Sequence, residues 1–164
     1  MKGRRVLLVS SVPLAAPWNG ADKNLARLLA MYDRDNSYIL QSDSAEPWPD
    51  ERIRVVRDRS ASPLPGMRQK LKALFFMLRQ THHADLIHIV ASIRHPNPLV
   101  GHFLRLWKRI SGRPLLHTAL SVGDGAVQAG HFAGDVTVVV SEYDRERVTR
   151  AGVHNVERLF PPLD

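Results

Sequence analysis

The sequence predicts an α/β fold, specifically a doubly wound, Rossmann-like parallel sheet. Arg5–Ser10 contains an uninterrupted apolar run, which is typical of a strand covered by helices on both faces. Further short apolar segments alternate with longer segments whose apolar residues recur at helical spacing. Ligands of such a sheet bind beyond the carboxyl ends of its strands, so we expect function in the loops that follow strands.

Size and hydropathy indicate one domain. The chain has 164 residues with 44% apolar side chains, enough for a single core. We expect the domain to span 1–160 and a linker to begin at 161–164, where Pro161 and Pro162 stand together. The apolar runs are shorter than the roughly 18 residues that span a bilayer, and the start lacks a signal-peptide core. The expected location is the cytoplasm.

The net charge and the absence of cysteine limit the binding partners and the kinds of site that the chain can have. The net charge of +7 favours polyanions such as phosphate esters, anionic lipids or nucleic acid. The absence of cysteine excludes disulfides, cysteine-based zinc sites and a cysteine nucleophile. Since no nucleic-acid-binding motif is present, we expect no nucleic-acid partner.

The first strand is expected to lead through the loop Ser11–Asp22 into a helix over Asp22–Met31. Asn19 and Gly20 precede that helix, whose free N–H groups favour an anion or a sugar hydroxyl. The alternative is an ordinary helix N-terminal turn. The loop matches neither the dinucleotide-binding glycine fingerprint nor the phosphate-binding P-loop, so we expect no cofactor in this domain.

The remaining elements follow from apolar periodicity. Strands are expected at Ser37–Gln41, Ile53–Arg57, Leu86–Val90, Pro114–Thr118, Val136–Val140 and Val156–Phe160. Helices are expected at Gly66–Gln80, with Met67, Leu71, Leu74, Phe75 and Leu78 on its buried face, and at Pro98–Ile110, with Leu99, Phe103, Leu106 and Ile110. A last helix over 142–151 should begin at a cap formed by Ser141 and Asp144 and stop at Gly152.

The first two of these helices are also basic. Phe76, Met77 and Trp107 fall away from the expected buried faces, among arginines and lysines. Basic amphipathic helices can lie on anionic membranes, so a peripheral contact at the inner face of the membrane is the alternative to plain core packing.

Two further loops carry candidate ligand-binding groups. Ser92, Arg94 and His95 follow the fourth strand, and Ser121 and Asp124 follow the fifth. The alternatives are a helix cap at the first loop and simple glycine turns at the second.

The sequence offers no pattern for metal or hydrolase chemistry. The eight histidines include no H-x-x-x-H pair, so we expect no metal. Asp33-Arg34-Asp35 resembles a metal-binding D-x-D motif, but its position between a helix and a strand favours a solvated turn. No nucleophile elbow accompanies the serines and histidines.

Together, several segments resemble the N-terminal half of a GT-B glycosyltransferase of the large retaining family four. They are RRVLLVSSVP followed by NGADKNLARLLA, then ADLIHIVAS, GRPLLHTALS and GDVTVVVSEYDRERVTRAGV. The last is the most specific, because the family has a strand there, then Ser-Glu opening a helix that closes at Gly-Val.

This resemblance implies an acceptor-binding domain of a transferase that uses a nucleotide-sugar donor. The donor and the paired glutamates would belong to a C-terminal domain on the same or a separate chain, so this domain alone should be inactive. The acceptor, a sugar or glycolipid, would meet Asn19, Gly20, Ser92, Arg94, His95, Ser121 and Asp124. The catalytic residues remain unassigned. The alternative is a noncatalytic or partner-dependent sugar-binding module.

The chain departs from the family pattern at three places. Asn19 replaces a second glycine beside Gly20, and Leu120 stands where the family has a histidine. His117 precedes that position, within the expected strand. Only 14 positions separate Ser121 from Asp135, which leaves room for one turn in place of a helix-containing segment. We therefore expect a reshaped acceptor site.

Overall fold

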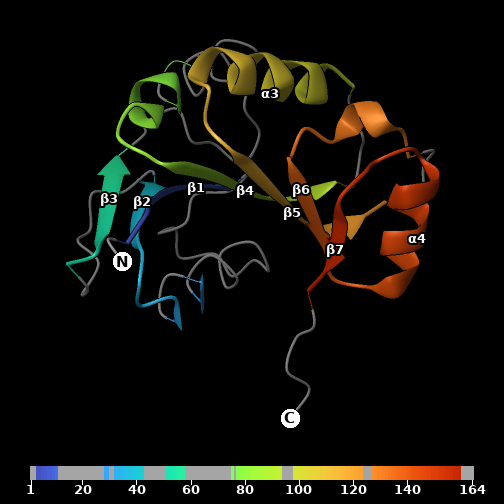
Figure 1. The fold of residues 1–164 in the computed structure, drawn as a ribbon, viewed down its shortest axis with the longest axis horizontal. Coiled ribbons are helices and arrows are strands. Elements are labelled where there is room, and N and C mark those ends of the chain that lie inside the picture. Colours follow the sequence, from blue (N-terminus) through green and yellow to red (C-terminus); the bar gives the residue numbers. More distant parts are fainter. Residues whose placement is uncertain are drawn as a thin grey trace. The chain divides into compact units, whose positions relative to one another are not determined.

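The computed structural model describes residues 3–10, 28–29, 32–42, 51–57, 75, 77–93, 98–123 and 127–159. Its strands form a seven-stranded sheet in the order β3-β2-β1-β4-β5-β6-β7 (Figure 1). The predicted α/β class with a Rossmann-like parallel sheet is confirmed. The chain divides into two compact units, Met1–Val90 and Ala91–Asp164, which we describe in turn.

The first unit is built around β1. It contains β1 (Arg5–Ser10), β2 (Ser37–Ser42), β3 (Ile53–Arg57) and most of β4 (Leu86–Ile93). β1 runs parallel to β2 on one side and to β4 on the other, with Leu7 opposite both Ile39 and Ile87. Leu7 and Ile87 are fully buried, as the uninterrupted apolar run of β1 predicts.

The turn before β2 is held by Asp33. The Asn36 amide and the Tyr38 hydroxyl each donate a 2.6 Å hydrogen bond to Asp33 Oδ2. Burial alone would raise the pKa of Asp33, but these hydrogen bonds lower it below its ordinary value. Arg34 and Asp35 are exposed in the turn. The expected turn is present and is solvated at Arg34 and Asp35, whereas the Asp33 carboxylate is bound within the protein.

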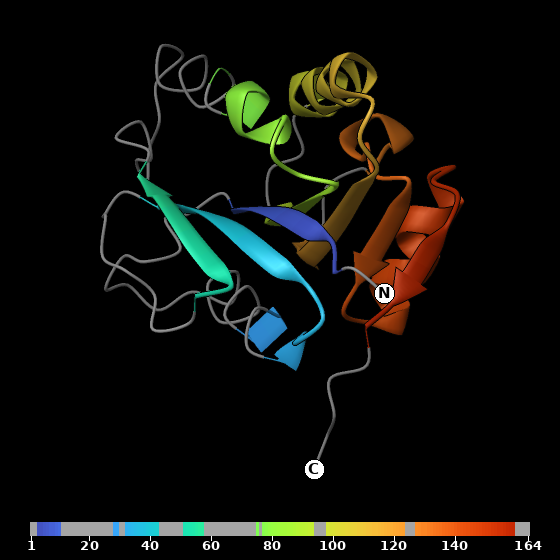
Figure 2. The ribbon, with the colours of Figure 1, turned by 60° about the vertical axis from the view of Figure 1, so that its left-hand side comes forward.

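The second unit contains β5 (Leu115–Val122), β6 (Val136–Val139) and β7 (Val156–Arg158), which pair in parallel in that order. Its helices are α3 (Pro98–Ser111), α4 (Glu142–Arg150) and the single 3-10 turn η1 (Ala129–His131). Figures 1 and 2 both show α4 beside β7, and η1 packs against α3. None of the helices in the described ranges is both long and apolar enough to cross a bilayer.

The ends of α4 are those that the sequence predicts. Ser141 Oγ accepts a 3.0 Å hydrogen bond from the Asp144 N–H and donates one of 2.9 Å to Asp144 Oδ2. At the other end Gly152 adopts φ +88°, and the Val153 N–H donates to the Val148 carbonyl at 3.3 Å. This left-handed glycine stop is a Schellman motif.

The predicted buried face of α3 is wrong. Leu106 and Ile110 are 56% and 64% exposed, whereas Leu104 and Trp107 are 6% and 1% exposed. Both pairs recur at helical spacing, so the sequence does not choose between the two faces. The choice follows from packing, because Gly101 lies on the side of Leu104 and Trp107 and lets the helix backbone come close to η1.

The helix before β4 shows the same error. Phe75 was expected on the buried face and is 69% exposed, whereas Met77, expected away from that face, is 8% exposed. Thr81 and Ala84, which follow Met77 toward β4, are also buried. The buried face of this helix is therefore the one that carries Met77, and the face expected from the largest apolar residues is exposed at Phe75.

Gly101 should be intolerant of any side chain. A Cβ there would lie 1.7 Å from the Gly130 carbonyl oxygen, which belongs to the backbone and has little room to move. We expect Gly101→Ala to destabilise the chain by about 1–3 kcal/mol, measured by urea unfolding. Gly130→Ala is the matched control, since among the described residues a Cβ at that position meets Arg105 Nη2 at 4.0 Å and no closer atom. Equal losses in the two variants would contradict the close helix approach.

Candidate functional site

The strand order reverses beside β1. From β1 the chain moves outward through β2 and β3, then returns to form β4 on the other side of β1. In doubly wound sheets ligands bind in the crevice beyond the carboxyl ends of the strands at such a reversal. β1 ends at Ser10, and β4 ends at Ile93.

Most of the predicted binding residues lie outside the described residues. These are Asn19, Gly20, Arg94, His95 and Asp124. The loop Ser11–Asp22 that carries the first two also lies outside. The structure does describe the backbone of Ser92 and Ser121, and both lie in secondary structure other than the one expected.

Ser92 and Ser121 were expected in loops but lie within strands. β4 continues three residues beyond the predicted end at Val90, and β5 continues four beyond Thr118. A strand's length depends on the hydrogen bonds that its neighbours offer, and a small alanine or serine does not end that ladder. Ser92 and Ser121 therefore stand on the rim of the sheet itself.

Ser121 is the predicted binding residue whose side chain the structure describes. Its hydroxyl oxygen is buried and makes no hydrogen bond to any described group. A buried hydroxyl without a partner costs about 1–3 kcal/mol, a loss that a bound ligand or water would remove. Because side chains alternate along a strand, Leu120 points to the opposite face of β5.

Arg147 holds the backbone that follows Ser121. Its guanidinium donates from Nη1 to the Val122 carbonyl at 3.2 Å and from Nη2 to the Gly123 carbonyl at 2.6 Å. Nη1 also lies 3.6 Å from Asp144 Oδ1, and the guanidinium carbon lies 5.2 Å from the centroid of the Tyr143 ring. The side chain is only 15% exposed, so it fixes the end of β5 against α4.

The sequence interpretation missed this arginine. A signal for it exists, because Ser141, Asp144 and Arg147 are spaced three residues apart and so fall on one side of a helix. The helix cap and the end of β5 thereby belong to one polar network, which gives the rim near Ser121 a fixed backbone.

His117 is a core residue rather than a ligand-binding group. It lies within β5, as expected, with 3% of its surface exposed and its ring 5.8 Å from that of Phe132. Burial lowers the pKa of His117 to about 4, so the imidazole is neutral near neutral pH. It does not substitute for the histidine that the resemblance would place at Leu120.

The segment between β5 and β6 is short, as expected. Its described part contains one 3-10 turn, η1, in which the Gln128 N–H donates to His131 Nδ1 at 3.3 Å. Among the residues that the structure describes, no three histidine or acidic side chains gather where they could hold a metal ion. At the end of β5 the buried Ser121 hydroxyl is the side-chain group with unused hydrogen-bonding capacity, since it can both donate and accept.

No family model and no curated protein matches the chain. The fold is therefore established by the strand order and the parallel pairings, and any more specific relationship rests on the motif residues alone.

Proposed function

We propose that this chain is the acceptor-binding half of a nucleotide-sugar-dependent glycosyltransferase of the GT-B kind. The observation that carries the proposal is the reversal of strand order between β1 and β4. The loops that follow these two strands in the sequence contain Asn19-Gly20 and Arg94-His95. Amide, guanidinium, imidazole and exposed backbone groups are the hydrogen-bonding partners that sugar hydroxyls require.

A second line of support is the segment on which the family resemblance is most specific. In GDVTVVVSEYDRERVTRAGV the family pattern places a strand, a Ser-Glu helix start and a Gly-Val helix stop. The corresponding elements here are β6, the cap at Ser141 and the left-handed turn at Gly152. The agreement in element boundaries supports the resemblance, although many unrelated proteins share this fold.

In the proposed reaction an acceptor hydroxyl forms a new glycosidic bond to the anomeric carbon of the donor. The bond from that carbon to the phosphate oxygen of the nucleotide breaks, the nucleotide leaves with its phosphates, and the proton of the acceptor hydroxyl passes to the departing phosphate. In this chain the acceptor would form hydrogen bonds with Asn19, Gly20, Ser92, Arg94, His95, Ser121 and Asp124. The donor would bind a second domain, supplied by the same chain or a partner.

Binding measurements on the chain test the proposal. We expect saturable binding of one acceptor from a panel of glycans and glycolipids, and no saturable binding of nucleotide sugars. The variant Asn19→Ala/Arg94→Ala should bind that acceptor about tenfold or more weakly, because two hydrogen-bonding groups are removed. Arg34→Ala, an exposed arginine in the turn before β2, is the control and should bind normally.

Two results would overturn the proposal. One is that no glycan of the panel binds, and the other is that a nucleotide sugar binds the chain saturably without a partner. Since Arg94→Ala also removes a charge, equal weakening by Arg34→Ala would indicate general electrostatic attraction instead of a built site.

Leu120 favours a second candidate, a noncatalytic sugar-binding module. A leucine cannot donate a hydrogen bond to a phosphate or hydroxyl, which the histidine of the resembled family could do. The transferase and the noncatalytic module can be distinguished by combining this chain with a domain that binds a nucleotide-sugar donor. Sugar transfer by the combined protein supports the transferase, whereas unchanged acceptor binding without transfer supports the module.

A further inference from the structure

A cationic pocket of about 780 Å³ lies in the second unit. It is bounded by the last turn of α3 and by the segments that lead into the amino ends of β5 and β6. It is therefore at the opposite edge of the strands from Ser121, and nothing in the proposed function uses it. Its charged lining comprises Arg105, Lys108, Arg109, Arg113 and Asp135.

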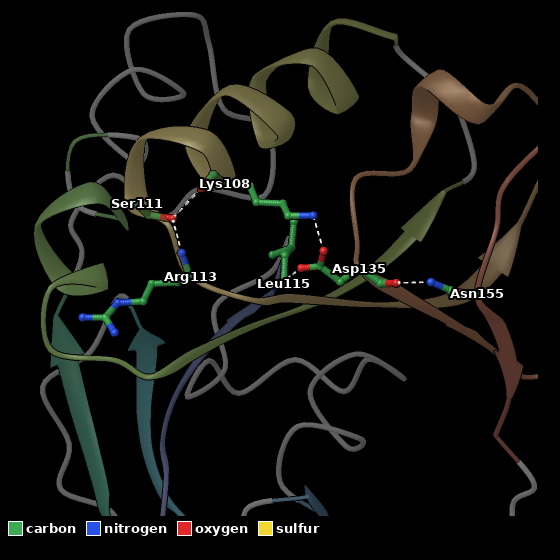
Figure 3. A network of polar contacts seen from close by, with 6 residues as sticks. All are labelled: Lys108, Ser111, Arg113, Leu115, Asp135 and Asn155. Carbon is green, nitrogen blue, oxygen red and sulfur yellow. Dashed lines mark hydrogen bonds and ion pairs between the residues drawn. The ribbon is translucent and has the colours of Figure 1, made fainter.

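Two of the four cations are held by the protein itself. Lys108 pairs with Asp135 Oδ1, and the other carboxylate oxygen accepts a 2.9 Å hydrogen bond from the Leu115 N–H (Figure 3). Burial alone would raise the pKa of Asp135, but these hydrogen bonds and the lysine charge lower it, so the carboxylate stays ionised. Arg105 Nη1 donates to the carbonyls of Gly130 and Phe132, at 3.0 and 3.1 Å.

The other two cations have no such partners. The side chains of Arg109 and Arg113 make no hydrogen bond or ion pair with any residue in the described ranges. Arg109 is exposed and Arg113 is half-buried. Figure 3 shows the Arg113 guanidinium directed away from Asp135. Four cations against one carboxylate leave the lining with a net charge of 4 − 1 = +3.

We infer that this pocket binds the phosphate group of an anionic ligand, with Arg109 and Arg113 making the direct contacts. A guanidinium matches phosphate oxygens with two parallel donors, and two of them can enclose one phosphate. Arg105 and Lys108, fixed by their own contacts, supply further positive potential. No acidic side chain of α3 opposes this field, because Pro98–Ser111 contains none.

The phosphate could be carried by a lipid headgroup or by a soluble ester. The neighbouring surface of α3 distinguishes the two, because Leu106 and Ile110 are more than half exposed there and flank Arg109 along the helix. Apolar side chains beside arginines enter the boundary between headgroups and acyl chains. A lipid surface would use this pair, whereas a soluble phosphate ester would not.

Vesicle cosedimentation and calorimetry with inorganic pyrophosphate test the site on the intact chain. The variant Arg109→Gln/Arg113→Gln should lose about tenfold or more in binding to phosphatidylglycerol vesicles, to pyrophosphate or to both. Arg145→Gln/Arg150→Gln removes the same charge from exposed positions of α4 and should bind within about twofold of the parent. Circular dichroism checks that all variants remain folded.

The variant Leu106→Ser/Ile110→Ser identifies the carrier. Weaker vesicle binding with unchanged pyrophosphate binding assigns the site to anionic lipid, and saturable pyrophosphate binding without vesicle binding assigns it to a soluble ester. The inference is overturned if neither probe binds, if the two double arginine variants lose binding equally, or if duplex DNA binds more tightly than both probes. Since acceptor binding is measured with glycans, its failure leaves this test unaffected.

Discussion

Replacing Trp107 with alanine should destabilise the chain by about 3–5 kcal/mol, the largest effect that we expect from truncating one side chain. Trp107 is 1% exposed and is the largest of the fully buried side chains among the described residues. The change removes the apolar area of an indole and leaves a cavity that rigid neighbours fill only in part. Total stabilities of domains are about 5–15 kcal/mol, so the variant should be close to unfolding at ambient temperature.

Urea unfolding followed by circular dichroism measures this loss. The matched control is Leu106→Ala, on the exposed face of the same helix, where Leu106 is 56% exposed. We expect that control to lie within about 0.5 kcal/mol of the parent, as surface substitutions usually do. A larger loss for Leu106→Ala than for Trp107→Ala would mean that α3 buries the opposite face.

Acid should destabilise the chain through His117. The pKa of a histidine is 6.5 in the unfolded chain and about 4 for His117 in the folded chain, because burial disfavours the charged ring. Between these values the unfolded state binds more protons than the folded state, so stability falls as the pH falls. The full contribution is present above pH 6.5 and is lost by about pH 4, a loss of about 3 kcal/mol.

To test this, the free energy of unfolding is measured at several pH values between 7.5 and 4.5, which gives its slope against pH. His117→Leu should flatten it, since leucine has a similar volume and takes up no proton. His154→Gln, an exposed histidine of the same unit, should leave the slope unchanged. Asp135, whose pKa is lowered from 3.8, loses its stabilising charge only below this range and so does not interfere. A slope that persists in His117→Leu would contradict the assignment.

The sequence predicted those features of the fold that are encoded locally. β1 and β3 have the predicted bounds: β1 contains the apolar run Val6–Val9, and β3 combines the β-branched residues Ile53, Val55 and Val56 in a short segment. The ends of α4 were predictable for a similar reason, since Ser141 and Gly152 supply a cap and a stop through contacts within a few residues.

Features that depend on distant contacts were not predictable. β4 and β5 continue past their expected ends, at Val90 and Thr118, and the residues that follow carry no local signal for where a strand stops. The buried face of α3 depends on Gly130, which lies far along the chain from Gly101. Ser121 was expected in a loop but lies within β5, and the hydrogen bonds that Arg147 donates to the two residues after it come from α4, which is distant in the sequence. The cationic pocket is lined by the end of α3 and by the residues before β5 and β6, so no single segment of the sequence predicts it.

Asp135 joins several of these elements, and the chain distances involved bear on how the second unit folds. Its carboxylate binds Lys108 and the Leu115 N–H, and its carbonyl accepts a hydrogen bond from Asn155 at 3.2 Å (Figure 3). The longest of the loops closed by these contacts spans 27 positions, and the other two span 20 each. The entropic cost of closing a loop grows only slowly with its length, so these three loops cost nearly the same to close. One residue thereby ties together parts of the second unit that lie 20 to 27 positions apart in the chain.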